Sequence, residues 1–423
     1  MNKPEPPIQK DYVPAREAIG ILDVREQTLY AYVSRGWIRS IRQPGRKDHL
    51  YLREDIEKLR RRSLARSGHG VVAASAMNWG EPIIPSSITE ITPDGPRYRG
   101  RLALDLARGG ASFEVVAELL WSGEWHEEPP RWRMTSQTAR VRNVAGSMAP
   151  PQSNDQLMET FALIALQLGM SRGSVEERVR SGAVFVAARE IIQTFTGCFG
   201  YISGHRRFYP MQSGQTIAEG LLRALALDES EENRLALEKM LVLFADHELT
   251  SSTFAARVTA SSGSTLHSCI TSAICANSGV HIGRLYNRVD AFLARASGKE
   301  LLLRRARQLQ ERGSAVPGFG HPLYPEGDPR ALLLLDIAKQ RKVQSKRLEA
   351  IYGFVDDAQK QLGLYPRQEL AVLTLAIAMG LPERSAGAIV TLSRTAGWVA
   401  HVQEQRLSGQ LLRPRAKLVV GHG

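Results

Sequence analysis

The chain has 423 residues, more than one hydrophobic core usually supports, so we expect two or more domains. Hydrophobic residues make up 43% and charged residues 23%, which is typical of an ordinary soluble globular protein. The net charge of +12 is uneven, because residues 1–70 hold 15 Lys and Arg against 9 Asp and Glu. Half of the excess therefore lies in a sixth of the chain, which predicts a basic N-terminal module with an acidic partner such as nucleic acid.

The three cysteines, Cys198, Cys269 and Cys275, are too few and too scattered for a disulfide framework or a zinc site. The N-terminal residues M-N-K-P-E-P-P-I-Q-K contain no apolar segment, so no signal peptide is predicted. The longest apolar run, Leu370 to Met379, is too short to span a membrane. These features predict a protein of the reducing cytoplasm with no membrane partner.

The N-terminal module reads as a short series of helices and strands. Pro14 stands where a first helical residue belongs, A-R-E-A-I-G-I-L follows with helical spacing, and Asp23 makes a turn. A second helix is predicted over Arg25 to Arg35 and ends at Gly36. The stretch W-I-R-S-I-R-Q-P-G-R-K-D-H-L-Y-L predicts two short strands, and Arg53 to Arg62 a third helix. This order indicates a winged helix-turn-helix.

Residues 1–62 resemble the DNA-binding domain of the MerR and excisionase type, followed by a linker of small residues and glycines over 63–78. The resemblance implies that the outer face of the second helix enters a major groove while basic residues of the wing meet phosphates. The residues expected to contact DNA are Arg25, Gln27, Tyr30, Arg35, Arg39, Arg42, Arg46 and Lys47. The alternative is a small basic domain that packs on its own protein or on a partner.

From about Trp79 onward, amphipathic helical segments with short Gly, Pro or Ser breaks replace strand patterns. Helices are predicted over Ser112–Trp121, Asp155–Leu168, Glu177–Thr196, Thr216–Leu227, Glu231–Ala245 and Leu370–Met379. The segment P-I-I-P-S-S-I-T-E-I-T, residues 82–92, predicts a short hairpin. The fold class is therefore mainly α.

One loop, Val316 to Ala331, has the sequence V-P-G-F-G-H-P-L-Y-P-E-G-D-P-R-A. Its glycines let the backbone come close to a ligand, and its prolines stiffen the path. His321 and Arg330 lie nine positions apart in it. Such a loop can hold an imidazole against a carbonyl group and a guanidinium against a carboxylate.

This loop resembles the signature loop of citrate synthases. Four other stretches on either side of this loop also resemble the family: Y-R-G-R-L at Tyr98–Leu102, A-D-H-E-L-T-S-S-T-F-A-A-R at Ala245–Arg257, S-R-T-A-G-W-V-A-H-V-Q-E-Q at Ser393–Gln405 and R-P-R-A at Arg413–Ala416. The resemblance implies a citrate synthase-like, two-domain, all-helical fold. Its large domain would hold residues 79–282 plus 392–423 and its small domain residues 283–391, in a homodimer whose subunits complete each other's sites.

The resemblance also implies the reaction. Acetyl-CoA or another short acyl-CoA would condense with oxaloacetate to give citrate or an alkylcitrate and CoA, with acetyl-CoA as a substrate, no covalently bound cofactor and no metal. His247, Arg330, Arg394 and, from the neighbouring subunit, Arg413 correspond to residues that bind oxaloacetate. His321 corresponds to the histidine that polarises the ketone.

The catalytic pair departs from the family pattern. Glu369 stands in place of the family's aspartate, eleven residues before Gly380, so a carboxylate base remains but with one more methylene. Ile282 stands where the enolate-stabilising histidine belongs, and His281 comes one place earlier. On a helical turn His281 points about a hundred degrees away, whereas a one-residue slip of the backbone returns it to the site. Our candidate catalytic residues are therefore His321, Glu369 and His281.

Three functions fit this sequence. The first is an enzyme of the citrate synthase class, weakened by its altered catalytic residues. The second is a DNA-binding regulator that uses a catalytically degraded citrate synthase fold as a dicarboxylate or acyl-CoA sensor. The third is an inactive subunit that forms a heterodimer with an active paralogue and lends it Arg413.

Overall fold

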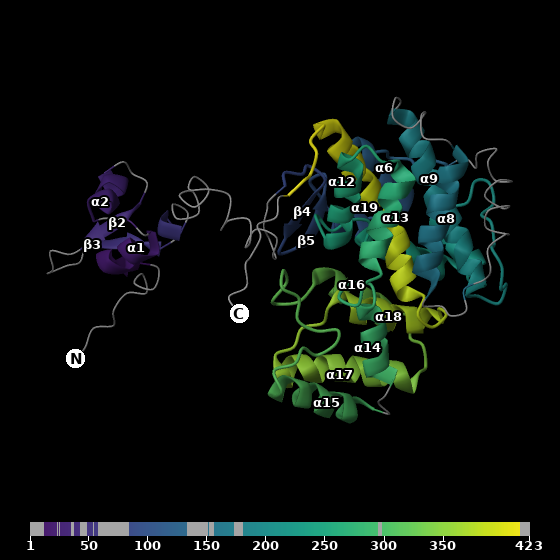
Figure 1. Ribbon diagram of the computed structural model, residues 1–423. Helices are drawn as coiled ribbons and strands as arrows, with labels where there is room; N and C mark the ends of the chain where they lie inside the picture. The colour runs from purple at the N-terminus through teal and green to yellow at the C-terminus, as the bar shows by residue number, and fades with distance from the viewer. Residues whose placement is uncertain are drawn as a thin grey trace, which may run out of the picture. The chain divides into compact units, whose positions relative to one another are not determined.

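The computed structural model describes residues 12–22, 24, 26–34, 38–42, 49–53, 55–57, 84–132, 151, 156–172, 181–294 and 298–414. The chain divides into two compact units, one of residues 1–85 with 413–423 and the other of residues 86–412. We call them the N-terminal unit and the main unit. Figure 1 shows both, with the main unit made almost entirely of helices.

In its described residues, the N-terminal unit combines a small sheet with short helices. Its strands are β1 (Tyr12–Pro14), β2 (Ser40–Arg42) and β3 (His49–Leu52), and its helices are α1 (Ala15–Leu22) and α2 (Glu26–Ser34). Strand β3 lies in the middle and pairs antiparallel with β1 and β2. Buried apolar side chains of these elements other than β2 form one core together with Ile38 and Ile56: Val13, Ala18, Leu22, Leu29, Ile38, Tyr51 and Ile56.

This unit contains both predicted helices and the predicted strand pair. One difference concerns Pro14, which ends the edge strand β1 instead of opening the first helix. A proline fits an edge strand because its missing N–H interrupts no interior ladder. Residues 53 and 55–57 are helical, as predicted for the third helix, while residues 58–62 and the wing turn at 43–48 lie outside the described residues.

The main unit is mainly α, as predicted. Its helices are α5 (Ala103–Arg108), α6 (Phe113–Ser122), α8 (Leu157–Arg172), α9 (Ser181–Cys198), α10 (Ile217–Ala224), α11 (Glu231–Leu243), α12 (Ser251–Ser261), α13 (Leu266–Asn277), α14 (Leu285–Ala294), α15 (Lys299–Glu311), α16 (Pro329–Gln340), α17 (Lys346–Leu362), α18 (Gln368–Met379) and α19 (Ala386–Ser408). Many begin at a Ser or Thr whose side chain accepts a backbone N–H three residues on, among them α10, α11 and α12.

The predicted hairpin is shifted along the chain. Strand β4 (Thr89–Thr92) pairs with β5 (Gly95–Tyr98), which pairs with β6 (Arg101–Leu102), so the first turn lies at Pro93 and Asp94 and not within 82–92. Proline suits the second position of such a turn and glycine the fourth. Gly95 has a φ of 119°, a backbone conformation that favours glycine.

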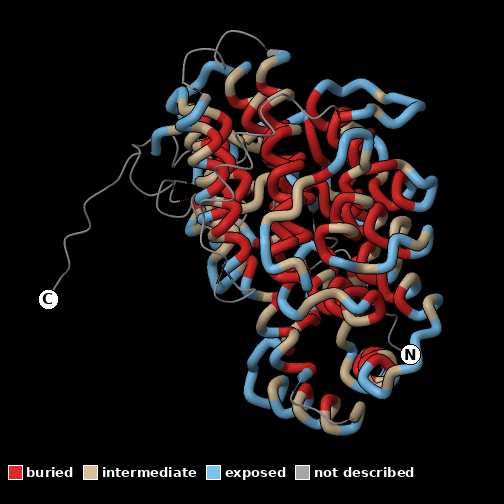
Figure 2. The backbone as a smooth tube through the Cα atoms, turned by 90° about the vertical axis from the view of Figure 1, so that its right-hand side faces the viewer, coloured by how far each residue is buried: buried red, intermediate tan, exposed pale blue. Residues whose placement is uncertain are grey.

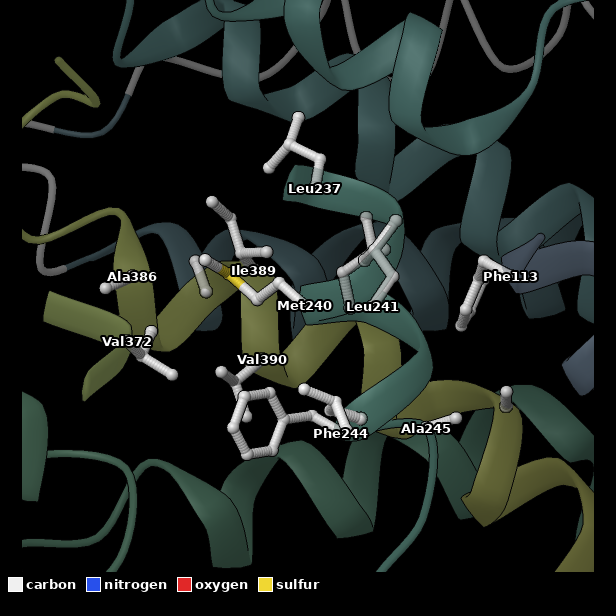
Figure 3. Close-up of a cluster of buried hydrophobic side chains, with 14 of the residues drawn as sticks. Phe113, Leu237, Met240, Leu241, Phe244, Ala245, Val372, Ala386, Ile389 and Val390 are labelled. Atoms are coloured by element: carbon white, nitrogen blue, oxygen red, sulfur yellow. The ribbon is translucent and has the colours of Figure 1, made fainter. Parts of the chain in front are cut away.

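Helices α11 and α19 form the centre of the main unit. Side chains of α11, including Leu237, Met240 and Leu241, lie among those of α19, α6 and α18 (Figure 3). Helix α19 is buried along nearly all of its length, from Ala386 to Val402. In Figure 2 the buried segments run through the interior of this unit. Both helices therefore give rigid support to the residues at or beyond their ends.

Helices α14 to α18 gather at the lower end of the main unit in Figure 1. Among them, α14, α16 and α17 pack on α18, and α15 packs on α17. The loop that holds His321 joins α15 to α16. This group corresponds to most of the small domain predicted from the sequence, whose bounds at 283 and 391 stay a prediction because residues 86–412 form one compact unit.

Candidate active site

The turn after α11 presents His247. Its neighbour Asp246 is fully buried, with one carboxylate oxygen 3.2 Å from Nε2 of His401 and accepting the N–H of Glu248 at 3.1 Å. Glu248 has a φ of 55°, so the chain turns sharply beside His247. The His247 ring is buried, and its Nε2 has no hydrogen-bond partner within the part of the chain that the structure describes. Asp246 thus holds the turn in place, and Nε2 of His247 remains available to a ligand.

The α15–α16 loop presents His321. Gly318 has a φ of 85°, and a side chain there would meet Cβ of Leu370 at 3.0 Å, so the loop needs glycine to lie against α18. The N–H of Leu323 donates to Nδ1 of His321 at 3.1 Å. In a neutral imidazole the other nitrogen then carries the proton, so Nε2 of His321 is a hydrogen-bond donor.

Both histidines are uncharged at neutral pH. Burial lowers the pKa of His321 to about 4, with Arg330 and Arg367 adding to the effect and Asp328 opposing it. Burial, followed by the charges of Arg330, Arg394 and His321, holds the pKa of His247 well below its usual value. Their ring centroids are 5.9 Å apart. The site therefore contains two neutral imidazoles side by side.

Arg330 lies in the first turn of α16. Asp328 caps this helix and also binds the guanidinium with both carboxylate oxygens, at 3.0 Å from Nε and 2.8 Å from Nη2. Both side chains are fully buried, and the guanidinium lies 5.4 Å from the Phe244 ring and 5.6 Å from the Tyr324 ring. Its Nη1 has no partner among the described residues, so one donor group remains for a ligand.

Arg394 comes from the middle of α19 and approaches the same phenylalanine. Its Nε donates to the carbonyl oxygen of Phe244 at 3.0 Å, and the side chain is buried. Burial lowers the pKa of Arg394, although the Asp246 carboxylate opposes this. Asp328 compensates the charge of Arg330. The buried guanidinium of Arg394, together with the open Nη1 of Arg330 and two neutral imidazoles, therefore makes a site that suits an anionic ligand.

Glu369 lies in the first turn of α18 and is 3% exposed. Arg367 binds its two carboxylate oxygens at 3.2 Å each. The backbone N–H of Arg367 donates to Gly318 at 2.8 Å, and its guanidinium lies 3.4 Å from the carbonyl oxygen of Gly320. The structure thus brings Glu369 to the loop that carries His321.

His281 does not join this buried group, because it is exposed in the turn before α14. Gly283 fixes that turn, because its N–H donates to the carbonyl oxygen of Asn277 at 2.7 Å. A Cβ on Gly283 would lie 2.3 Å from that carbonyl oxygen. The side chain next to it, Ile282, is half-buried and has no donor group. A catalytic role for His281 stays a prediction that this placement does not support.

Five residues that hold or face the site were missed in the sequence: Asp246, His401, Tyr286, Asp328 and Arg367. Asp328 had a readable signal, since an Asp before a Pro at the start of a helix is a common cap. The Asp246–His401 contact joins segments far apart in the chain, so no spacing rule reveals it. Tyr286 reads as one more apolar position of a helix.

The predicted DNA-binding residues are only partly described. On α2, Gln27 and Tyr30 are exposed, and the Tyr30 hydroxyl donates to Glu26 at 2.7 Å. Arg39 is exposed but forms a two-pronged ion pair with Asp55 at 2.8 and 2.9 Å, so this guanidinium is less available to a phosphate than expected. Arg25, Arg35, Arg46, Lys47 and the side chain of Arg42 lie outside the described residues.

Arg413 is exposed and belongs to the N-terminal unit, so its role in the site stays a prediction. Where the chain is described, no group of three or more His, Cys, Asp or Glu is arranged to hold a metal ion. Over the same residues, no helix is both long enough and apolar enough to cross a membrane.

The candidate site thus combines two histidines, two arginines and a carboxylate on a helical scaffold. The family described as "Citrate synthase, C-terminal domain" matches residues 77–415. Similar proteins include a 2-methylcitrate synthase of Shewanella oneidensis, 27% identical over 79% of this chain and 91% of that protein. Another is citrate synthase 2 of Bacillus subtilis, 28% identical over 78% of this chain and 92% of that protein.

Solved structures show the same fold. The complex of carboxymethyl coenzyme A and oxaloacetate with citrate synthase from Thermoplasma acidophilum has a TM-score of 0.65 at 22% identity, covering 81% of this chain and 95% of that one. Citrate synthase of Thermotoga maritima gives 0.64 at 23% identity over the same shares. The chain belongs to the citrate synthase family, and its class is that of a condensing acyltransferase.

Proposed function

We propose that this protein condenses acetyl-CoA, or a slightly longer acyl-CoA, with oxaloacetate, and hydrolyses the product thioester to give citrate or an alkylcitrate and CoA. The observation that carries this proposal is the meeting of two neutral imidazoles with two buried guanidiniums at one place. Oxaloacetate has two carboxylates and a ketone. The guanidiniums suit the carboxylates, and the imidazoles suit the ketone. The names of the relatives support the same reaction class.

The two carboxylates of oxaloacetate would be bound by arginines. Arg394 has its Nε on the backbone of Phe244, which directs the rest of its guanidinium elsewhere, and Arg330 has Nη1 without a partner in the described structure. Arg413 of the partner subunit would complete the set. Planar guanidiniums fix a carboxylate with two parallel hydrogen bonds, so they orient the ketone as well as binding the substrate.

The ketone would accept a hydrogen bond from Nε2 of His321. The Leu323 N–H holds the ring in the tautomer that has its proton on this nitrogen. His247 supplies a second neutral imidazole with an open Nε2. A fixed donor that needs no reorganisation stabilises the charge that develops on the ketone oxygen as the new carbon–carbon bond forms.

Glu369 would remove the proton from the acyl methyl group. Its ion pair with Arg367 holds the carboxylate in one orientation, but it also occupies lone pairs that the base needs. Displacement of a reacting group by about 1 Å can cost a factor of about 100 in rate. We therefore expect turnover in the lower part of the ordinary enzyme range.

We also propose a homodimer and a DNA-binding N-terminal unit. Three apolar side chains on one face of α8 are exposed, Leu163, Leu166 and Met170, and their spacing supports a contact with a second copy of the chain. The order of helices and strands in the N-terminal unit supports a winged helix-turn-helix. Of its predicted DNA contacts, Gln27 and Tyr30 on exposed positions of α2 suit a major groove best.

The test is release of CoA thiol from purified protein given oxaloacetate with acetyl-CoA or, separately, propionyl-CoA. A blank without oxaloacetate subtracts the three cysteines of the protein. We expect turnover of about 1 per second or more, within the usual enzyme range. His321→Gln should abolish most of it, whereas His126→Gln, at an exposed position, should not.

Absence of release from a folded protein whose melting temperature still rises with oxaloacetate would contradict the enzymatic proposal. That result would instead fit a sensor or a partner subunit, because ligand binding to the native state stabilises it without any chemistry.

A further inference from the structure

Helix α14 carries a tyrosine that the reaction described above does not use. Tyr286 is 6% exposed, and its hydroxyl has no hydrogen-bond partner among the residues that the structure describes. A buried hydroxyl without a partner costs free energy, because it loses its bonds to water and gains none in return. Such a group in a native protein needs a structural or functional explanation.

The surroundings of Tyr286 connect it to the candidate active site. Its ring lies on α19, where a Cβ on Gly387 would be 3.4 Å from Cδ2 of the ring. Val289, three residues later on the same face of α14, lies 3.2 Å from the position of a Cβ on Gly318, beside Leu370. This face of α14 therefore meets both the loop that holds His321 and the start of α18, which holds Glu369.

The charges that act on the Tyr286 hydroxyl are those of site residues. They belong to Glu369, Arg394, Arg330 and Arg367, in order of decreasing effect. One is the proposed base and two are the proposed carboxylate-binding arginines. The hydroxyl thus lies close enough to interact electrostatically with the proposed base and with the proposed carboxylate-binding arginines.

We propose that the Tyr286 hydroxyl donates a hydrogen bond to the thioester oxygen of the acyl-CoA as that oxygen becomes an enolate. The proposal rests on the proposed function. In this chain Ile282 occupies the place of the family's donor and has no N–H or O–H in its side chain, and His281 is exposed. Tyr286 lies four residues beyond Ile282, in the first turn of α14. Its ring and the carbonyl oxygen of Gly283, the neighbour of Ile282, both lie against Gly387, so Tyr286 approaches the same region.

Enolate formation and condensation need no reagent beyond the acyl-CoA and oxaloacetate. Glu369 takes a proton from the acyl methyl group, and the electrons of the broken C–H bond pass to the thioester oxygen. The Tyr286 O–H stabilises that oxygen and keeps its own proton. When the enolate carbon attacks the ketone, the thioester C=O forms again, and the new alkoxide, held by Nε2 of His321, takes up the proton that Glu369 removed. Water then cleaves the thioester: its oxygen bonds to the acyl carbon as the carbon–sulfur bond breaks, and CoA leaves as its thiol.

The hydroxyl stays protonated around neutral pH. Burial raises the pKa of Tyr286, and the negative charge of Glu369 adds to this while the three arginines oppose it. A tyrosine in this state is a constant donor and never a base.

The experiment compares Tyr286→Phe with Tyr352→Phe. Tyr352 on α17 also has a buried hydroxyl without a partner in the described part of the chain, so the control removes the same atom under the same conditions but away from the site. We expect Tyr286→Phe to lower kcat about 100-fold or more, the usual cost of one such donor, with the KM for oxaloacetate within twofold. Tyr352→Phe should keep the kcat of the unaltered protein.

A second readout isolates the proton-transfer step. Loss of the acyl methyl protons of acetyl-CoA to D2O, followed by NMR, reports enolate formation before condensation. Tyr286→Phe should slow this exchange by the same factor as kcat, and Ile282→His in the Tyr286→Phe background should restore part of both rates.

The outcomes are distinct. If the unaltered protein releases no CoA, the proposed function and this inference both fail. If it is active and Tyr286→Phe keeps kcat and proton exchange within threefold, the proposed function stands and the role of Tyr286 is wrong.

Discussion

Glu114 and Glu238 are two buried carboxylates that stand outside the candidate site. Glu238 accepts the N–H of Phe113 at the start of α6, and Glu114 accepts that of Ile217 at the start of α10. Burial raises the pKa of Glu238 to about 8, and the neighbouring charge of Glu114 adds to this. Burial also raises the pKa of Glu114. The pair therefore holds a proton at neutral pH, and each member caps a helix.

This proton makes the stability of the protein depend on pH. The native pKa of Glu238, about 8, lies above the ordinary value of 4.5, so between these values the native state holds a proton that the unfolded state has lost. The free energy of unfolding then falls as pH rises through this window. Glu238→Gln keeps an acceptor for Phe113 and needs no proton, so its melting temperature should fall less than that of the unaltered protein between pH 6 and pH 9.

The control is Glu231→Gln on the same helix, an exposed residue paired with Arg234. It should follow the unaltered protein across this range. Equal pH profiles for Glu238→Gln and the unaltered protein, recorded by thermal denaturation, would show that the pair does not hold the proton.

At the same scale, the sequence allowed prediction of the residues that the structure brings together at the candidate site but not of the residues that hold them there. His247, His321, Arg330 and Arg394 lie in short stretches whose residue order carries the family resemblance. The Tyr286 hydroxyl, which has no partner among the described residues, lies where α14 packs on α18 and α19. Nothing in the local sequence separates this residue from a core tyrosine. The exposure of His281 follows from the packing around its turn, which the local sequence does not reveal.

Among the elements, the crossing of α19 with the turn after α11 depends on one glycine. The N–H of Gly397 donates to Ala245 at 2.9 Å, and a Cβ at this position would lie 2.1 Å from Oδ1 of Asp246 and 2.7 Å from the Ala245 carbonyl oxygen. Neither group can move away, because Asp246 is fully buried and bound to His401.

Gly397→Ala should therefore destabilise the protein by about 1–3 kcal/mol and weaken oxaloacetate binding through the displaced turn at His247. The matched control is Gly182→Ala on α9, where a Cβ meets nothing within 4 Å and alanine favours the helix by up to about 1 kcal/mol. Chemical denaturation and a binding titration give the two quantities. A Gly397→Ala protein as stable as the control would contradict this prediction. It would show that α19 and the turn after α11 can move apart far enough to accept a Cβ.

Helices were the elements best predicted, because apolar residues at helical spacing and Ser or Thr caps are local signals. The hairpin was misplaced by a few residues because the Pro93–Asp94–Gly95 turn decides the register, and the apolar run before it does not. Strand β1 was missed, since three residues of an edge strand show no alternation.

For the whole molecule, the proposed exchange of Arg413 between subunits gives a sharp prediction. His321→Gln and Arg413→Gln subunits should each be nearly inactive alone. When the two are refolded together in equal amounts, about half of the dimers are mixed, and each mixed dimer has one site with both defects and one with none. Activity should then return to about a quarter of that of the unaltered protein.

The control mixture combines His321→Gln with Arg394→Gln. These residues belong to the same subunit's main unit, so every site in a mixed dimer keeps one defect, and no activity should return. Failure of the first mixture to recover, with mixed dimers demonstrated by light scattering and mass spectrometry, would place Arg413 outside the site.

The burial of α19 from Ala386 to Val402 also has a consequence for synthesis. Ribosomes make α11 long before α19, so the apolar side chains of α11 that α19 covers, such as Met240 and Leu241, must wait uncovered on the growing chain. Exposed apolar surface of this kind promotes aggregation. Production of this protein should therefore depend on chaperones and on slow translation at low temperature more than its many short, well-capped helices suggest.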